Sequence, residues 1–284
     1  MAAGRPRVGL VVGSGGIKCA AAVGLWKALR REGIEVDLAV GCSGGSIYTA
    51  ALALGQDVGW AEERTHVMWR DLFRRVHYRS LLRVALPRLF GYSERVGILD
   101  DRRIAAVMRD LYGDATFADT RIPLWIAATD LRTGERVNLD EGRIADAVRA
   151  SIAIPVLLRP WPVNGRLLVD GGASNPLPVD VAIREGCDVI IAMGFETPVV
   201  EEFGSVLRTF AQAGTIATNH LLRATYAFHS VVHHAEIVPL IPTFDQRIGL
   251  GDTALLGHII EAGERAAEAE LPYLRRLLAG RVAS

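Results

Sequence analysis

The feature that most constrains this 284-residue chain is an apolar run followed by a glycine-rich turn and a second apolar segment. Residues 38–40 have the composition of a buried strand, and the apolar segment after the turn has that of a buried helix. In the turn between them, Gly41 and Gly45 stand two positions before and after Ser43. A strand-to-helix turn this sharp leaves no room for side chains at those two positions. It also holds the serine hydroxyl out over the edge of the sheet.

The Ser43 hydroxyl would lie beside the backbone N–H groups that open the helix, beginning at Gly44. N–H groups in that arrangement can stabilise an oxyanion. Glycine- and serine-rich turns also follow strands for purely structural reasons, so this motif alone leaves both interpretations open.

A second glycine-rich turn follows the first predicted strand, residues 8–12, and includes Gly13, Gly15 and Gly16. The composition of residues 20–31 predicts a helix directly after it. A loop between a strand and a helix presents N–H groups and a positive dipole end to an anion. It could therefore hold a nucleotide phosphate, a dinucleotide pyrophosphate or a reaction oxyanion.

The spacing of residues in this loop separates the three uses. A phosphate-binding P-loop needs Gly-Lys-Ser/Thr, whereas Ile17 separates Gly16 from Lys18. A dinucleotide site would need a third glycine where Lys18 stands and an acid at the end of the second strand, but Asp37 lies at its start. The oxyanion use needs only that the first two strands be neighbours in a parallel sheet, which would place this loop beside Ser43.

A further short strand, residues 167–169, is predicted to end in Asp170, Gly171 and Gly172. An acid at the carboxyl end of a buried strand lies where open α/β sheets place their sites. A serine nucleophile needs a neighbouring base, and desolvation raises the pKa of a carboxylate and makes it a stronger base. Asp170 is thus the predicted partner of Ser43, although a turn or a helix N-cap is an equally good use of such an aspartate.

A Ser-Asp-His hydrolase would instead need a histidine after the acid. The predicted helices over residues 206–234 and 254–278 hold the candidates, which are His220, His229, His233, His234 and His258. Histidines on such helical faces are usually packed or solvated, which favours the Ser-Asp pair.

Together these motifs resemble the patatin-like phospholipase family, serine acyl hydrolases with a Ser-Asp dyad on an α/β sheet. Four segments carry the resemblance in the family's order. Residues 14–19 resemble its glycine-rich oxyanion loop, 41–45 its G-x-S-x-G elbow, 150–155 its A-S-x-A-x-P segment and 170–172 its D-G-G/A motif. The resemblance implies a three-layer α/β/α fold with a mostly parallel central sheet.

The resemblance also assigns roles to individual residues. It makes Ser43 the nucleophile and Asp170 the general base, with an oxyanion hole around Gly15, Gly16 and Lys18. The chain departs from the family pattern at two loop positions that are usually glycine, which are Ser14 and Cys19. Bulkier residues there could misplace the N–H donors.

Residues 57–98 are the most unusual region, because apolar side chains alternate with many arginines over residues 64–95. This composition suits a helical cap over an apolar site or a basic amphipathic segment on an anionic lipid surface. Pro87 and Gly91 exclude a single continuous helix. The same pattern is also typical of surface helices that leave their arginines solvated.

Composition limits the remaining possibilities. Half of the residues are apolar and the net charge is zero, which predicts one α/β domain over residues 1–284 with 57–98 embedded in it. Balanced charge argues against a nucleic-acid partner. The three cysteines show no C-x-x-C spacing, so neither a disulfide framework nor a zinc site is expected. The hydrolase interpretation calls for no metal or cofactor. Because no apolar run approaches the about 18 residues of a membrane span, we expect a cytoplasmic protein that can contact membranes peripherally.

The sequence therefore predicts hydrolysis of a carboxylic ester of a lipid, through an acyl-enzyme on Ser43 with Asp170 as the base. Two alternatives remain open. One is a catalytically weak protein whose loop at residues 13–16 binds an anion such as a phosphate head group. The other is an esterase or thioesterase that acts on soluble short-chain esters.

Overall fold

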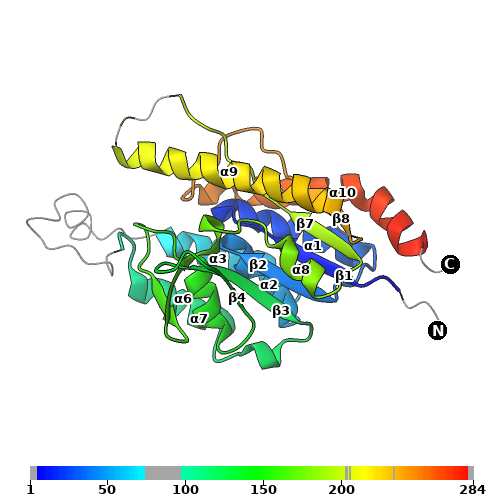
Figure 1. Cartoon of the computed structure of the whole chain (residues 1–284), viewed down its shortest axis with the longest axis horizontal. Helices are drawn as coiled ribbons and strands as arrows, with labels where there is room; N and C mark the ends of the chain where they lie inside the picture. The colour runs from blue at the N-terminus through cyan, green and yellow to red at the C-terminus, as the bar shows by residue number, and fades with distance from the viewer. Residues whose placement is uncertain (1–4, 74–96, 202–203, 205, 233, 281–284) are drawn as a thin grey trace, which may run out of the picture.

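The computed structural model describes residues 5–73, 97–201, 204, 206–232 and 234–280. Within these residues one mixed sheet carries helices on both faces (Figure 1). Its eight strands are β1 (Val8–Val12), β2 (Leu38–Cys42), β3 (Leu124–Asp130), β4 (Arg136–Leu139), β5 (Trp161–Val163), β6 (Arg166–Asp170), β7 (Val189–Met193) and β8 (Glu236–Leu240). The strand order is β5-β6-β3-β2-β1-β7-β8, and β4 pairs with β3.

The two strands that carry the glycine-rich turns are parallel neighbours. Val12, the last residue of β1, pairs with Gly41 near the end of β2. Strands β3, β7 and β8 run in the same direction. The loops that follow β1 and β2 therefore leave the sheet at the same edge, which confirms the neighbourhood predicted from the sequence.

The strand that carries Asp170 runs the other way. β6 pairs antiparallel with β3, and Asp170 lies opposite Ala128. Because Ala127 pairs with Cys42, Asp170 reaches the level at which β2 gives way to Ser43. Asp170 therefore lies beside the end of β2, as we expected, but our reason was wrong, because β6 is not parallel to β2. Asp170 arrives there because β6 is short and approaches from beyond the end of β2.

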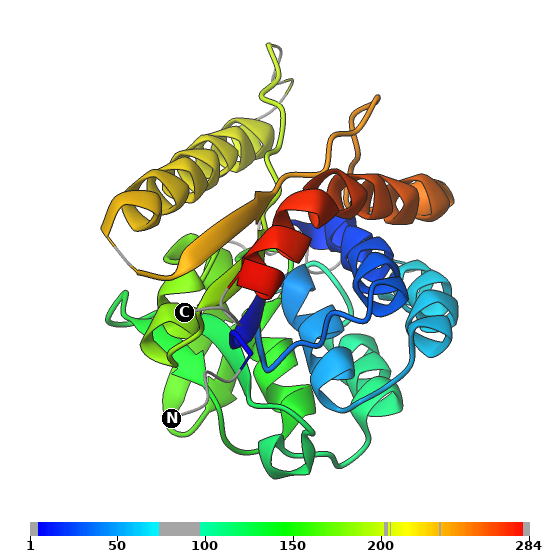
Figure 2. The same ribbon diagram turned by 90° about the vertical axis from the view of Figure 1, so that its right-hand side faces the viewer.

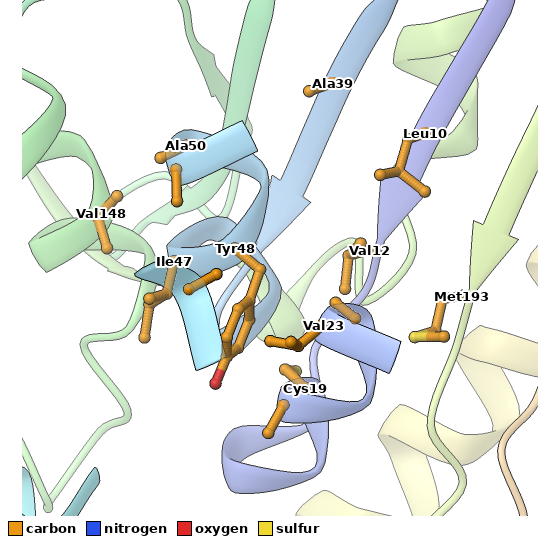
Figure 3. Close-up of a cluster of buried hydrophobic side chains, with 14 of the residues drawn as sticks. Leu10, Val12, Cys19, Val23, Ala39, Ile47, Tyr48, Ala50, Val148 and Met193 are labelled. Carbon is orange, nitrogen blue, oxygen red and sulfur yellow. The ribbon is translucent and has the colours of Figure 1, made fainter. Parts of the chain in front are cut away.

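Two apolar clusters cover the two faces of the sheet, as alternation along a strand requires. Leu10 and Val12 of β1 belong to one cluster, and Val11 belongs to the other. Figure 3 shows the first cluster, in which β1 faces Val23 of the first helix and Tyr48 of the second. The layers are thus helices, sheet and helices.

The described residues form eight α-helices: α1 (Ala21–Arg31), α2 (Gly44–Ala53), α3 (Val58–Phe73), α6 (Asp101–Tyr112), α7 (Ile144–Ser151), α8 (Val179–Arg184), α9 (Val206–Val232) and α10 (Leu256–Gly280). Four 3-10 turns complete them: η1 (Gly16–Ala20), η2 (Phe117–Asp119), η3 (Gly171–Ala173) and η4 (Thr253–Leu255). Among the described helices, none combines the length and the hydropathy that a membrane span needs.

Helices α1 and α10 pack closely on one face of the sheet (Figure 2). Glycine allows this approach, because a Cβ atom on Gly24 would lie 2.0 Å from the Ile260 carbonyl oxygen. A Cβ atom on Gly263 would likewise lie 1.9 Å from the carbonyl oxygen of Ala21. The terminal helix is thus fixed against the helix that follows the first glycine-rich turn.

The predicted arginine-rich insertion begins in α3, but residues 74–96 lie outside the described residues. Within α3, Arg64 contacts Asp110 at 3.0 Å, and Asp71 accepts from Arg103 at 3.0 Å. These pairs hold α3 against α6. The insertion itself stays a prediction.

Candidate active site

Ser43 lies at the turn between β2 and α2 with a strained backbone. Its φ of 53° and ψ of −130° fall in a backbone region that residues other than glycine rarely adopt. Such a conformation costs about 1–3 kcal/mol. The flanking glycines explain how the turn forms. A Cβ atom on Gly41 would lie 2.4 Å from Ser46 Cα, and one on Gly45 would lie 2.2 Å from the Val12 carbonyl oxygen. Only glycine fits at these positions, so the sequence requires the sharp elbow that exposes the serine hydroxyl to the site.

The structure brings Ser43 and Asp170 together. The Ser43 hydroxyl donates to Asp170 Oδ2 at 2.6 Å, and the backbone N–H of Gly172 donates to Oδ1 at 2.7 Å. Asp170 therefore partners the serine and also caps the η3 turn, so the two uses that the sequence left open are both realised.

Burial controls the acidity of this carboxyl group. The side chain of Asp170 is only 6% exposed. Desolvation raises its pKa to about 6, against the smaller lowering effects of the hydrogen bonds from Ser43 and Gly172. A carboxylate with a pKa near 6 is ionised at neutral pH and is a stronger base than an ordinary aspartate.

A buried serine on α7, Ser151, holds the backbone of the turn at Ser43. The backbone N–H of Ser43 donates to Ser151 Oγ at 2.8 Å, and Ser151 Oγ donates to the Ala127 carbonyl oxygen at 2.7 Å. The sequence marked the segment around Ser151 only as a family motif. Its role as a bridge between α7, β3 and the elbow becomes visible in the fold.

Asp170 has a second support that the sequence did not reveal. Thr129 on β3 donates to the Asp170 carbonyl oxygen at 3.1 Å and shares a 2.7 Å hydrogen bond with Ser174. No local pattern marks Thr129, because its role depends on the antiparallel pairing of β3 with β6.

The glycines of the first turn lie against the elbow. Gly16, Ser43 and Gly44 line the same cavity. A Cβ atom on Gly44 would lie 2.5 Å from the Gly16 carbonyl oxygen, so the two turns are in direct contact. Among the hydrogen bonds of the described chain, none uses the backbone N–H of Gly15, Gly16 or Gly44. These N–H groups therefore have the spare hydrogen-bonding capacity that an oxyanion hole requires, and two of the three residues, Gly16 and Gly44, line the cavity with Ser43.

The side chain of Lys18 is directed elsewhere. Its ammonium group donates to the Glu196 carbonyl oxygen at 3.0 Å and to Thr197 Oγ1 at 2.6 Å, in the loop after β7. Burial lowers the pKa of Lys18 to about 8. Thr197 is in turn held by Asn219 of α9, which accepts from its N–H at 3.1 Å and donates to its carbonyl oxygen at 2.8 Å. Lys18 therefore ties the glycine loop to β7 and α9, and its amine is not a partner of Ser43.

The two departures from the glycine pattern are accommodated. Ser14 donates its backbone N–H to the Pro176 carbonyl oxygen at 2.7 Å, and its hydroxyl packs beside Gly172. Cys19 is fully buried, and its thiol donates to the Gly13 carbonyl oxygen at 3.3 Å. Both side chains thus have room in the fold: Ser14 lies against Gly172, and Cys19 lies against Gly13 and Gly44.

Cys42, beside the serine, is a poor rival nucleophile. It is fully buried, and desolvation raises the pKa of its thiol well above the ordinary value. Nor do the described residues gather three or more histidine, cysteine or acidic side chains in a position to bind a metal ion.

The cavity beside Ser43 is lined almost entirely by apolar side chains. They come from α2, α3, α6 and the segments around residues 152–158 and 250, and include Ile47, Trp69, Leu72, Ile104, Ile152 and Leu250. Such a lining favours a hydrocarbon group next to the hydroxyl.

Comparison with known proteins assigns the chain to a family. The family model described as patatin-like phospholipase matches residues 10–183, which contain all four sequence motifs. The chain belongs to the patatin-like phospholipase family. An uncharacterized NTE family protein of Mycobacterium tuberculosis is 34% identical over 191 residues, which cover 66% of this chain and 49% of the relative. The neuropathy target esterase sws of Drosophila melanogaster is 28% identical over 188 residues, covering 66% of this chain and 13% of the relative. The chain thus spans half or less of the length of these relatives.

Solved structures of other proteins share the fold. Human GIVD cytosolic phospholipase A2, in complex with methyl gamma-linolenyl fluorophosphonate, matches with a TM-score of 0.56 and 12% identity, over 98% of this chain and 59% of that chain. VipD from Legionella pneumophila matches with a TM-score of 0.50 and 12% identity, over 95% of this chain and 67% of that chain. The patatin-like fold, with its mixed and mostly parallel sheet, is thereby established.

Proposed function

We propose that this patatin-like protein hydrolyses carboxylic esters of lipids through an acyl-enzyme on Ser43. The observation that carries the proposal is the 2.6 Å hydrogen bond from the Ser43 hydroxyl to Asp170, a buried carboxyl group with a pKa of about 6. A hydroxyl becomes a useful nucleophile when a positioned base removes its proton, and this pair meets that requirement.

In the proposed reaction, Ser43 Oγ attacks the ester carbonyl carbon while its proton passes to Asp170. The negative charge on the carbonyl oxygen is stabilised by the N–H groups of Gly15, Gly16 and Gly44. The intermediate then collapses, and the leaving alcohol takes the proton from Asp170. Water next attacks the acyl-enzyme with Asp170 again as the base, which releases the carboxylic acid and restores the Ser43 hydroxyl.

The apolar cavity supports a lipid acyl group as the part of the substrate next to Ser43. A chain of methylene groups placed against Ile47, Trp69 and Ile104 would leave water, at about 0.8 kcal/mol for each buried methylene. Affinity should therefore rise with acyl length until the cavity is full. A water-soluble short-chain ester would gain little from this lining.

Labelling with a fluorophosphonate probe tests the proposal. The probe should modify the wild type at Ser43 and leave Ser43→Ala unmodified, and lipid esters should be cleaved only by the wild type. A protein that binds lipid head groups but is never labelled would be the catalytically weak binding protein instead. Hydrolysis of short soluble esters that does not improve with acyl length would favour the soluble esterase alternative.

Two broader expectations remain proposals. One is that residues 1–284 form a single domain with an embedded cap at residues 57–98. The other is that the arginine-rich segment 64–95 contacts an anionic membrane surface, an expectation that concerns residues mostly outside the described part of the chain. Neutralising Arg74, Arg75 and Arg79 tests the second: vesicle hydrolysis should fall while hydrolysis of a soluble ester persists.

A further inference from the structure

Exposed apolar side chains gather at the end of the sheet that carries Ser43. The described residues expose eight large apolar side chains, and five of these lie there: Leu131, Val156, Val199, Phe210 and Ile241. We propose that this set, the apolar rim, docks the protein onto the surface of a lipid bilayer. The choice of a lipid partner rests on the proposed function, whereas the position of the rim rests on topology and exposure.

Strand direction places three members of the rim. Leu131 directly follows β3, Ile241 directly follows β8, and Val199 lies in the loop that leaves β7. All three strands are parallel to β2, which ends immediately before Ser43. These side chains therefore leave the sheet at the edge where the nucleophile lies.

Val156 belongs to a segment that also walls the cavity. Its neighbours Ile154 and Leu157 line the space beside Ser43, and its carbonyl oxygen accepts from the N–H of Ile98 at 3.1 Å. Val156 has a φ of 72°, which is a strained conformation for a β-branched residue, and its side chain is 39% exposed. The backbone strain at Val156 destabilises the fold, and the partial burial of its side chain offsets little of that strain. A partner outside the chain accounts for that arrangement.

Phe210 extends the rim away from the sheet. Helix α9 is fixed to the end of β7 by Asn219, which pairs with Thr197, and by Tyr226, whose hydroxyl donates to the Ala192 carbonyl oxygen at 2.8 Å. Phe210 precedes Asn219 by nine residues and so lies about 13 Å farther along the helix. Figure 1 shows this end of α9 reaching beyond the sheet. Phe210 is 73% exposed.

The arrangement of the rim fits a fluid apolar partner. Its members project from five separate segments, whereas a protein partner would need one continuous complementary surface. A bilayer admits scattered apolar side chains individually, and the headgroup region favours cations beside them. Residues 206–232 contain no aspartate or glutamate, and exposed arginines accompany two members of the rim, Arg132 beside Leu131 and Arg208 near Phe210. The loop that carries Val199 also contains three glutamates. Glu196 pairs with Arg223, Glu201 is exposed, and Glu202 follows it in the sequence.

Docking in this orientation would also serve the chemistry. The apolar cavity lies at the same end of the sheet, next to Ser43. An acyl chain could then pass from the bilayer into the cavity without its full length crossing water, which removes the cost of exposing each methylene.

Phe228 provides a matched control for Phe210. It lies on the same helix and is 58% exposed. The two residues are 18 positions apart, which is five helical turns, so they share one face of α9 about 27 Å apart. Of these two residues, docking by the rim requires Phe210 and not Phe228. Any contact along the whole helix, whether with a flat membrane or with a second copy of the chain, requires both.

The test measures binding of the full chain to vesicles of phosphatidylcholine and phosphatidylglycerol by cosedimentation, in the Ser43→Ala background so that lipid is not consumed. Phe210→Ser should weaken binding about tenfold, and Val199→Ser combined with Ile241→Ser by a similar factor. Phe228→Ser should bind within twofold of the parent. Because all four side chains are exposed, thermal unfolding should show that every variant is folded.

Equal weakening by Phe210→Ser and Phe228→Ser would overturn the proposal, and if a concentration-dependent dimer were lost as well, α9 would be a contact between copies. Unchanged vesicle binding in all variants would overturn it too. Failure of fluorophosphonate labelling would contradict the proposed hydrolysis but leave the vesicle result intact, so the two proposals can fail separately.

Discussion

Two opposing effects act on the pKa of the Asp170 carboxyl group. Its two hydrogen bonds favour the ionised form, yet its burial is the larger effect and raises its pKa to about 6. The residue is thus held as a base that is ionised at neutral pH and still ready to accept a proton.

A pH profile follows from this pKa. The reaction needs the ionised carboxylate, so kcat/KM for a soluble ester should rise as pH increases through about 6 and then level off. Initial rates from pH 4 to 8, with protein stability checked at each pH, would measure it. A midpoint near 4, where an ordinary aspartate titrates, would show that burial does not control this group.

The same shift predicts a cost in stability. The folded pKa lies above the unfolded one, so the folded protein binds more protons, and stability falls as pH rises from about 4 to about 6. Asp170→Asn can keep both hydrogen bonds without the buried charge. It should raise the free energy of unfolding by roughly 2–3 kcal/mol at pH 7 and hardly at pH 4, while activity is lost. Urea unfolding at both pH values measures this, and equal effects at both would contradict the linkage.

Ser151 should matter through the residues it positions. Ser151→Ala leaves the Ser43 N–H and the Ala127 carbonyl oxygen without their partner, which should cost about 1–3 kcal/mol in stability or in the activation barrier. The rate of hydrolysis should fall by about 10- to 100-fold with little change in KM. Thr49→Val is the matched control, because the Thr49 hydroxyl bonds only to carbonyl oxygens within its own helix. An equal loss of rate in both variants would assign the effect to general packing.

At the scale of elements, the strand–turn–helix units were predictable because their steric demands are local. Gly41 and Gly45 must lie two positions from Ser43, and the sequence shows that spacing directly. The same holds for the turn at residues 13–16. The sequence thus predicted which residues could form the site, and the structure places Ser43 beside Asp170.

The direction of β6 was not predictable in this way, because pairing direction depends on how distant segments pack. Strand β5 was missed for a different reason. Pro162 makes Trp161–Val163 a poor strand candidate, and yet Asn164-Gly165 is a strong hairpin signal. Both turn residues have positive φ, 48° and 75°, and they join β5 to β6. That dipeptide therefore predicts an antiparallel pair, and with it the direction in which β6 approaches Ser43.

A pair of glycine substitutions tests the contact between the two turns. Gly45→Ala would place a methyl group 2.2 Å from the Val12 carbonyl oxygen, so backbone must shift and the urea midpoint should fall strongly. Gly214→Ala, in an open position on α9, should instead stabilise by about 0.5–1 kcal/mol. A tolerated Gly45→Ala would mean that the elbow is not packed against β1 as the structure places it.

At the scale of the whole molecule, the site depends on segments that span most of the chain. The nucleophile follows β2, the base follows β6, and Lys18 links the glycine loop to the loop after β7 and thence to α9. The sequence placed Lys18 at the oxyanion loop but could not show that its amine reaches Glu196 and Thr197, since those residues are remote in the chain. The single-domain organisation stays a prediction.

Trapping the covalent intermediate tests the account most directly. The protein is mixed with a long-chain fatty-acyl nitrophenyl ester, quenched with acid during turnover, digested, and examined by peptide mass spectrometry. We predict the acyl mass on the peptide that contains Ser43, at the residue itself, and its absence in Ser43→Ala. Turnover with no acyl-peptide at any time, or with the acyl group on Cys42 or another residue, would contradict nucleophilic catalysis by Ser43.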